Sequence, residues 1–129
     1  MTDRLKIDRL LRDLYAARVR SDLDGVCRTF SHDAEFQIAG AGRASPVTIR
    51  AFGIDEIRSW LALLMKTFQL SDHQVLTEII EGAKAAVHWR TKIYSRITGA
   101  SVATELIDLV LIRDDRITSF IEFFVPRET

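Results

Sequence analysis

Residues 102–125 read VATELIDLVLIRDDRITSFIEFFV, and this stretch decides the fold class. Apolar residues alternate on both sides of the turn residues Arg113-Asp114-Asp115, which is the pattern of two strands joined by a tight hairpin. The same period of two extends backwards along the chain. It predicts strands at 72–81, 84–97, 102–113 and 116–125, with short breaks at 81–83, 98–100 and 113–115. Short breaks indicate consecutive hairpins and therefore an antiparallel meander.

The first half of the chain has a different periodicity, with apolar residues at helical spacing. It predicts helices over 3–20, from Ser21 to about Phe30, and over 55–68. A short strand at 35–38 and a long loop at 39–53 lie between the second and third helices. We therefore expect one domain over residues 1–129, of class α+β: a cone-shaped, curved antiparallel sheet wrapped around three N-terminal helices, in the order α-α-β-α-β-β-β-β.

Composition excludes several classes of function. The 129 residues carry 18 basic and 18 acidic side chains, so no basic footprint for nucleic acid is present. The longest apolar run, Trp60 to Met65, is far shorter than a membrane span, and we see no signal-peptide core. Three scattered histidines and one cysteine match no metal motif. We expect a cytoplasmic protein without metal or cofactor, whose zero net charge permits self-association.

Two carboxylates stand at positions where apolar residues would be expected. Asp108 lies in the middle of a strand that is apolar on both faces, as for a strand covered on both sides, and Glu122 lies between Phe120 and Phe124. A buried carboxylate needs a partner or keeps its proton, because an unpaired buried charge costs several kcal/mol. Arg90, on the preceding strand, is the candidate partner. The set is either a buried ion pair that fixes register or part of a functional pocket.

The turn decides whether the two carboxylates meet. A two-residue loop, Asp114-Asp115, pairs Arg113 with Arg116 and puts the carboxylates on opposite faces of the sheet. A three-residue loop puts them on one face as diagonal neighbours. Both registers are chemically possible, so the sequence leaves this choice open.

The strand at 84–97 has two contrasting rows of side chains. One row carries His88, Arg90 and Lys92, and it is either a solvated face or one wall of a polar cavity. The other row carries Val87, Trp89 and Ile93. We expect this apolar row on the outer face of the sheet, as the surface of a homodimer.

Several segments resemble the ketosteroid isomerase-like and SnoaL-like families of the nuclear-transport-factor-2-like superfamily. They are Tyr15-Ala16-Ala17 with Asp22 to Gly25 and Phe30 to Ala34, then Asp72 to Val75 with Glu81 to Ala85. The closing hairpin, 111–124, is similar to that of limonene-epoxide hydrolases. The resemblance implies a conical pocket. It matches Asp108 to the isomerases' protonated strand aspartate, and Arg90 and Glu122 to part of the hydrolases' water-activating set. Ile38 and Lys92 stand at positions where these families have other acidic residues.

Two kinds of function fit these observations. The first is a cofactor-independent isomerase, cyclase or hydrolase acting on a small, largely apolar molecule, with Asp108 or Glu122 transferring a proton and Arg90 stabilising negative charge. The second is a module that only binds such a molecule. Either kind can be dimeric. The side chains expected to contact the substrate are His88, Lys92, Tyr15, Phe36, Ile38, Trp60, Phe120 and Phe124.

Overall fold

The computed structural model describes residues 4–39 and 49–125. These ranges contain three helices, all in the first half of the chain: α1 (Arg4–Val19), α2 (Leu23–Cys27) and α3 (Ile54–Thr67). Asp22, rather than Ser21, caps α2, because its carboxylate accepts a hydrogen bond from the amide of Gly25. The six strands are β1 (Phe30–Ala39), β2 (Ile49–Phe52), β3 (Phe68–Glu81), β4 (Lys84–Ser95), β5 (Ser101–Arg113) and β6 (Arg116–Phe124).

The strands form one sheet in the order β2-β1-β6-β5-β4-β3. The expected meander of β3 to β6 is present, and the α+β class is confirmed. Two features differ from the expectation. The sheet is mixed, because β1 pairs with β6 in parallel. Part of the segment expected to be a loop, Ile49–Phe52, is strand β2, which pairs with β1; residues 40–48 of that segment lie outside the described residues.

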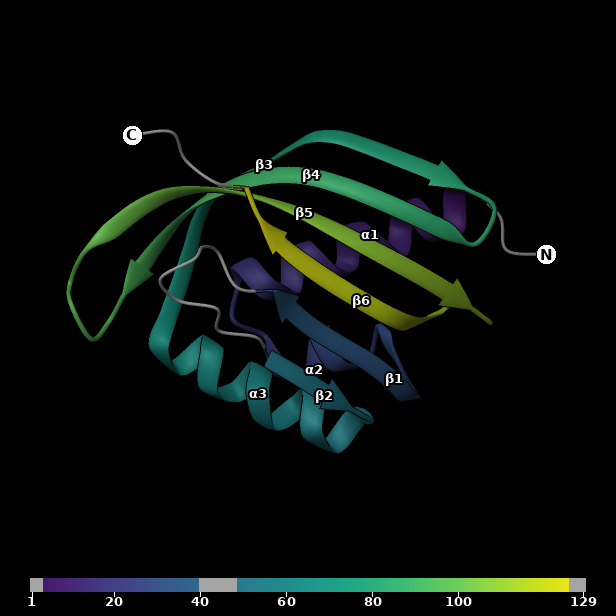
Figure 1. Cartoon of the computed structure of the whole chain (residues 1–129), viewed down its shortest axis with the longest axis horizontal. Coiled ribbons are helices and arrows are strands. Elements are labelled where there is room, and N and C mark those ends of the chain that lie inside the picture. The colour runs from purple at the N-terminus through teal and green to yellow at the C-terminus, as the bar shows by residue number, and fades with distance from the viewer. Residues whose placement is uncertain (1–3, 40–48, 126–129) are drawn as a thin grey trace.

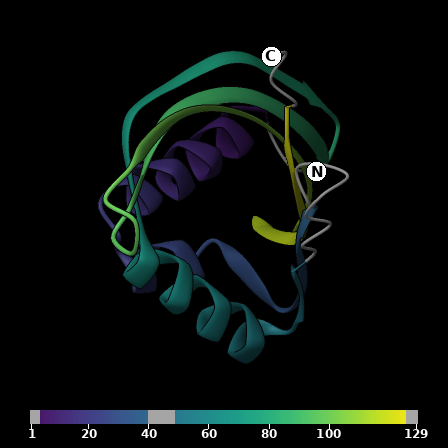
Figure 2. The same ribbon diagram turned by 60° about the vertical axis from the view of Figure 1, so that its left-hand side comes forward.

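The sheet bends around the helices, so that they cover its concave face (Figures 1 and 2). Helix α1 packs against β3 under the curved sheet, while α3 lies on the opposite side beside β1 and β2. The two helices bury the apolar stripes that their sequence periodicity predicted. These stripes include Ile7, Leu11 and Leu14 of α1 and Ile57 and Leu61 of α3. The resulting shape is the expected cone, with its core between α1 and the inner face of the sheet.

The hairpin between β5 and β6 combines features that the two expected registers kept apart. Its loop has two residues, Asp114 and Asp115, both with positive φ (51° and 61°), and Arg113 pairs with Arg116. Two positive φ values are the signature of the type I′ hairpin turn. A β-bulge follows at Thr118, which is paired with no residue of β5. Ile112 pairs with Ile117 and Leu111 with Ser119. Beyond this extra residue, the β6 side chains that would have pointed outward point to the inner face, and the reverse.

That reversal sets the geometry of the two carboxylates. Asp108 pairs directly with Glu122 in the β5–β6 register. Both side chains point to the inner face, and they are 0% and 2% exposed. Without the bulge, the two-residue loop would have placed one of them outside. Neither expected register alone is right, because each left out a bulge inside the strand.

Strand β4 lies the opposite way round from the expectation. Val87 and Trp89 point inward and are 0% and 1% exposed, while Ile93 is half-buried beside them. The row of His88, Arg90 and Lys92 lies on the outer face. The expected outer surface of Val87, Trp89 and Ile93 is therefore wrong, because the helices cover the row that is more apolar.

Candidate functional site

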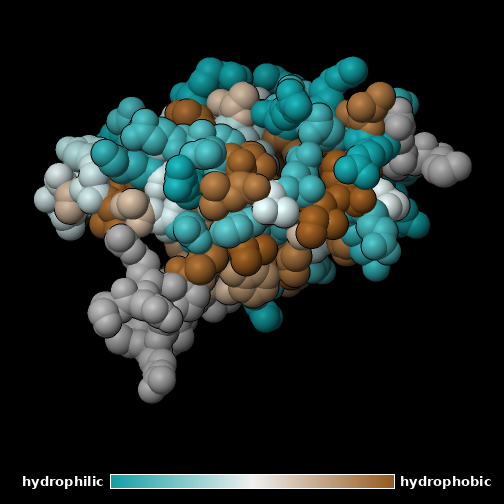
Figure 3. All heavy atoms as spheres, turned by 90° about the horizontal axis from the view of Figure 1, so that it is seen from above, coloured by the Kyte–Doolittle hydropathy of each residue, from teal (hydrophilic) through white to brown (hydrophobic). Residues whose placement is uncertain are grey.

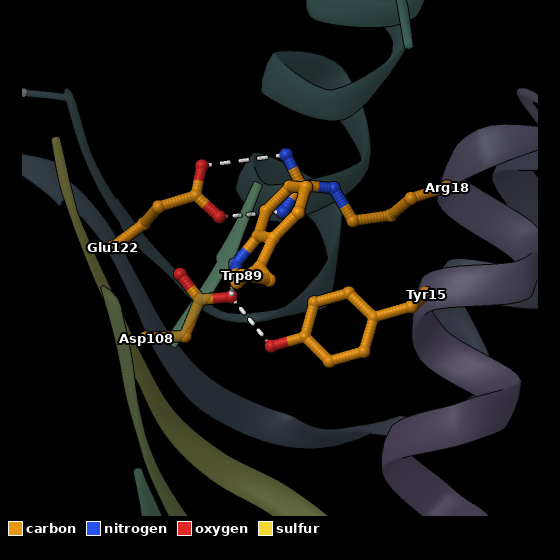
Figure 4. A network of polar contacts seen from close by, with 5 residues as sticks. All are labelled: Tyr15, Arg18, Trp89, Asp108 and Glu122. Atoms are coloured by element: carbon orange, nitrogen blue, oxygen red, sulfur yellow. Dashed lines mark hydrogen bonds and ion pairs between the residues drawn. The ribbon is translucent and has the colours of Figure 1, made fainter. Parts of the chain in front are cut away.

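The buried carboxylate pair is held by an arginine from helix α1. Arg18 Nη1 donates to Glu122 Oε2 at 2.6 Å, and Nη2 donates to Oε1 at 3.3 Å. The contact is thus bidentate, the geometry that gives an arginine–carboxylate pair its strength and orientation. The guanidinium also lies over the Trp89 ring, 5.4 Å from its centre. Figure 4 shows Arg18 and Tyr15 reaching from α1 toward the two acids on the sheet.

Arg90 does not take part in this set, contrary to the expectation. Its side chain is exposed on the outer face, where Nε and Nη2 donate to Gln74 of β3 at 3.0 and 2.6 Å. The sequence does contain a signal for Arg18. Ile7, Leu11, Leu14 and Arg18 follow one another at helical spacing, so Arg18 continues the buried stripe of α1 as a charged residue.

Asp108 uses its two oxygens differently. Oδ2 accepts hydrogen bonds from the Tyr15 hydroxyl at 2.6 Å and from Trp89 Nε1 at 2.7 Å. Oδ1 is buried and has no hydrogen-bond partner in the described part of the chain. It lies on the side of the pair that faces Glu122 (Figure 4). A buried oxygen in that position is satisfied if it carries a proton and donates to the neighbouring carboxylate.

A count of charges leads to the same conclusion. Two ionised carboxylates and one guanidinium would leave a net negative charge inside the protein, whereas one proton on the pair makes the set neutral. Burial, and then the negative charge of Glu122, raise the pKa of Asp108 well above its ordinary value. Burial alone would lower the pKa of Arg18, but the charge and hydrogen bonds of Glu122 raise it. We therefore assign the proton to Asp108.

Three aromatic rings pack around this set. The His73 ring stacks on Tyr15 with centres 5.2 Å apart and an angle of 27°, and it contacts Trp89 at the same distance. Burial, and then the charge of Arg18, lower the pKa of His73, so the imidazole is neutral at pH 7. Burial raises the pKa of the Tyr15 hydroxyl, as do the charge and hydrogen bond of Asp108. His73 is not among the residues that were expected in the site.

A cavity of about 470 Å³ opens beside the pair. Glu122, Arg18 and Trp89 form part of its wall. Tyr15 and Asp108 are not in the wall, so they form a layer behind Glu122. The rest of the lining is mainly apolar, with polar side chains at the β4–β5 end; it comprises Ile38, Ile49, Leu61, Leu64, Met65, Phe68, Leu70, Ile93, Ser95, Thr98, Ala100, Val102, Thr104, Leu106 and Phe124. Its volume is in the range that small organic ligands occupy.

The structure divides the five apolar residues that were expected to contact the substrate into three groups. Ile38 and Phe124 lie in the cavity wall. Phe36 and Phe120 are buried and stack on each other, with ring centres 5.6 Å apart, away from the cavity. Trp60 is 37% exposed on α3 and points away from it.

His88 and Lys92, which were also expected to contact the substrate, lie on the outer face of the sheet and not on the cavity side. His88 Nε2 lies 3.1 Å from Glu105 Oε2, and Lys92 Nζ lies 4.0 Å from Asp72 Oδ2, both on the outer face of the sheet. They cannot reach the cavity, because the sheet lies between. In the described ranges, 4–39 and 49–125, no three His, Cys, Asp or Glu side chains are placed to hold a metal ion, and no helix is long and apolar enough to cross a membrane.

Fold and site define a class: a conical α+β domain with an apolar pocket beside a buried acid pair. A family model for the SnoaL-like domain matches residues 11–120. The chain therefore belongs to the SnoaL-like family, as its sequence suggested. No curated protein matches it in sequence.

Solved structures with the same fold are distant in sequence. A "putative isomerase" from Bacillus subtilis is 20% identical, with a TM-score of 0.84 over 98% of this chain and 91% of that one. An LEH-like epoxide hydrolase from M. tuberculosis is 15% identical, with a TM-score of 0.76 over 94% and 84%. An NTF2-like protein from Burkholderia xenovorans is 16% identical, with a TM-score of 0.79 over 97% and 93%. At these identities the likeness establishes the nuclear-transport-factor-2-like fold.

Proposed function

We propose that this protein is a cofactor-independent enzyme that binds a small, uncharged, largely apolar organic molecule in the 470 Å³ cavity and transfers a proton through Glu122. The observation that carries the proposal is the position of Glu122. Its side chain is 2% exposed, yet it forms part of the wall of an apolar cavity. A carboxylate kept from bulk water and in reach of a bound molecule is suited to general acid–base work.

Each neighbour has a distinct role in such a step. Arg18 orients the Glu122 carboxylate and, being in the cavity wall itself, can stabilise negative charge that develops on a substrate oxygen. Asp108 holds the second proton of the pair and is a positioning residue, because it lies behind Glu122. Isomerisation, aldol-type cyclisation and hydration all need a proton moved between a carbon or oxygen atom and a base, so all three remain within the proposal.

The balance of charge favours an uncharged substrate. Arg18 is already neutralised by Glu122 at 2.6 Å, and Asp108 carries its proton. A substrate anion would meet no unpaired cation in the described part of the cavity wall, and a cation would meet no unpaired carboxylate. Burying either charge there would cost several kcal/mol.

Proton transfer can be tested without knowing the natural substrate. A panel of neutral apolar ketones, lactones and epoxides is screened for compounds that raise the melting temperature. Binders are then incubated with the protein in D₂O and examined by mass spectrometry for deuterium next to the carbonyl, ring opening or isomerisation. We expect Glu122→Gln to reduce the rate roughly 10²- to 10⁴-fold, the usual contribution of a positioned acid or base. Glu81→Gln, the same change at an exposed position at the end of β3, should leave it unchanged.

The alternative is a module that binds the same class of molecule without converting it. One observation favours it: both oxygens of Glu122 are occupied by Arg18. Ligands that stabilise the protein but undergo no exchange or conversion would establish the alternative. Conversion at an equal rate by wild type and Glu122→Gln would show that another group is the base.

A further inference from the structure

Strand β3 contains a β-bulge at Asp72 and His73. Ser71 and Gln74, on either side, each pair with one residue of β4. Between them, Asp72 and His73 together face the single residue Thr91. Asp72 has a φ of 54°, in the left-handed region, and the buried Thr91 hydroxyl donates to the Ser71 carbonyl at 2.7 Å. The bulge is therefore fixed to β4, and bulges of this kind redirect the side chain that they carry.

The bulge places the imidazole of His73 on the inner face of β3. Asp72, before it, lies on the outer face, 4.0 Å from Lys92. Gln74, after it, is also on that face and accepts a hydrogen bond from Arg90. Figure 3, viewed from above the sheet, shows many hydrophilic side chains on this face, where an imidazole would be in contact with water. The ring of His73 is instead directed inward, toward helix α1.

This placement of His73 costs free energy. Its Nε2 is buried and has no hydrogen-bond partner within residues 4–39 and 49–125. A buried polar atom without a partner costs about 1–3 kcal/mol. A left-handed residue other than glycine, such as Asp72, adds backbone strain. Unfavourable features of this kind concentrate at functional sites, where the position of a side chain is maintained at the expense of stability.

The ring of His73 contacts both side chains that donate hydrogen bonds to Asp108. Its centre lies 5.2 Å from the ring centre of Tyr15 and 5.2 Å from that of Trp89. Those two rings also contact each other, with centres 5.3 Å apart, so the three rings form a closed set. The Tyr15 hydroxyl and Trp89 Nε1 both reach Oδ2 of Asp108. We propose that His73 is a positioning residue, which holds Tyr15 and Trp89 in place as the two donors to Asp108.

The two donors determine how the Asp108 carboxyl is oriented. Because both bind Oδ2, the other oxygen, Oδ1, is left on the side of Glu122 (Figure 4). If either ring moves, the carboxyl can turn, and the proton between the two acids is no longer held in one geometry. The effect of His73 on catalysis rests on the proposed function, since this residue is not in the cavity wall and acts only through Asp108.

The imidazole acts here as a flat, uncharged ring. Arg18 already lies over Trp89, 5.4 Å from the ring centre, so a charged side chain at position 73 would put a second cation beside the same indole. Burial and the charge of Arg18 lower the pKa of His73 and keep it neutral. Phenylalanine at this position provides an uncharged ring, whereas leucine provides apolar volume without a ring. These two substitutions separate the contribution of the ring from that of the volume.

The test follows the hydrogen bond from Trp89 to Asp108 through hydrogen exchange of the indole N–H, measured by NMR. The chain has two tryptophans, and Trp60, which is 37% exposed, is the internal reference. We expect His73→Leu to speed the exchange of the Trp89 N–H at least roughly tenfold, and His73→Phe to retain the wild-type rate. The matched control is Phe36→Leu, which removes a buried, stacked ring away from the cavity and should have a much smaller effect.

Catalysis provides the second measurement. His73→Leu should slow deuterium incorporation into the compounds that wild type converts by roughly 10- to 100-fold at an unchanged KM, and His73→Phe should restore the rate. Circular dichroism confirms that each variant is folded. Unchanged exchange of the Trp89 N–H in His73→Leu, an equal effect of Phe36→Leu, or no recovery in His73→Phe would overturn the proposal. If wild type converts none of the compounds, the proposed function is refuted, and the exchange of the Trp89 N–H still decides the role of His73.

Discussion

Replacing Arg18 by methionine should lower the free energy of unfolding by about 3–5 kcal/mol, the usual cost of removing one partner from a buried ion pair. Methionine keeps most of the length of the side chain and its packing on Trp89. It removes both hydrogen bonds to Glu122, whose carboxylate is 2% exposed and contacts no other cation among residues 4–39 and 49–125. The loss is measured by urea unfolding at neutral pH.

A second substitution separates the buried charge from the lost packing. Arg18→Met combined with Glu122→Gln removes the unpaired carboxylate, so the double variant should be more stable than Arg18→Met alone. Arg20→Met is the matched surface control. Arg20 contacts Asp22 at 3.3 Å with its side chain 62% exposed, and its loss should cost less than about 1 kcal/mol. Equal effects of Arg18→Met and Arg20→Met would show that Arg18 does not hold a buried charge.

The protonated state of Asp108 predicts very different results for two substitutions at that position. Asparagine has the shape of a protonated aspartate: its oxygen can accept from Tyr15 and Trp89, and its amide can donate to Glu122. Asp108→Asn should therefore change the free energy of unfolding by less than about 1 kcal/mol. Asp108→Leu leaves the Tyr15 and Trp89 donors without an acceptor. It should cost about 2–6 kcal/mol, at about 1–3 kcal/mol for each orphaned group.

The same assignment gives a dependence on pH with a definite sign. Because the pKa of Asp108 is raised in the folded protein, the folded protein binds this proton more tightly than the unfolded chain does. The stability that this carboxyl contributes is complete below its ordinary pKa and is lost as the pH rises through the folded value. Wild type should therefore lose stability relative to Asp108→Asn as the pH increases. If the stability of wild type relative to Asp108→Asn instead increases over that range, Asp108 is ionised and paired.

Much of the fold could be predicted from the sequence, because it depends on periodicity. The stripes of α1 and α3 and the alternation of β3 to β6 are each properties of a continuous segment. The parallel pairing of β1 with β6 is a contact between distant segments, and the four residues of β2 are too few for a periodic signal. Neither leaves a local pattern that could be recognised.

The candidate site was predicted in part. Asp108 and Glu122 are conspicuous, since each is a charge at an apolar position. Their relative placement depends on the bulge at Thr118. The bulge changes the face to which the later side chains of β6 point, and the composition of the strand does not reveal it. Arg90 was predicted as the partner because it lies on the neighbouring strand, but its side chain is on the outer face, and the arginine that contacts Glu122 comes from α1. Trp89 looked suited to a dimer surface, but its indole is buried and donates to Asp108.

The central claim is that one proton is held within the buried pair, on Asp108, so that Glu122 faces the cavity as a carboxylate. Infrared spectroscopy observes this proton directly, because a protonated carboxyl group has a C=O stretching band that an ionised carboxylate lacks. With carbon-13-labelled aspartate at neutral pH, we expect wild type and Glu81→Gln to show a shifted band from one buried protonated acid, and Asp108→Asn to lack it. A wild-type spectrum without such a band, or a band that Asp108→Asn retains, would contradict the claim.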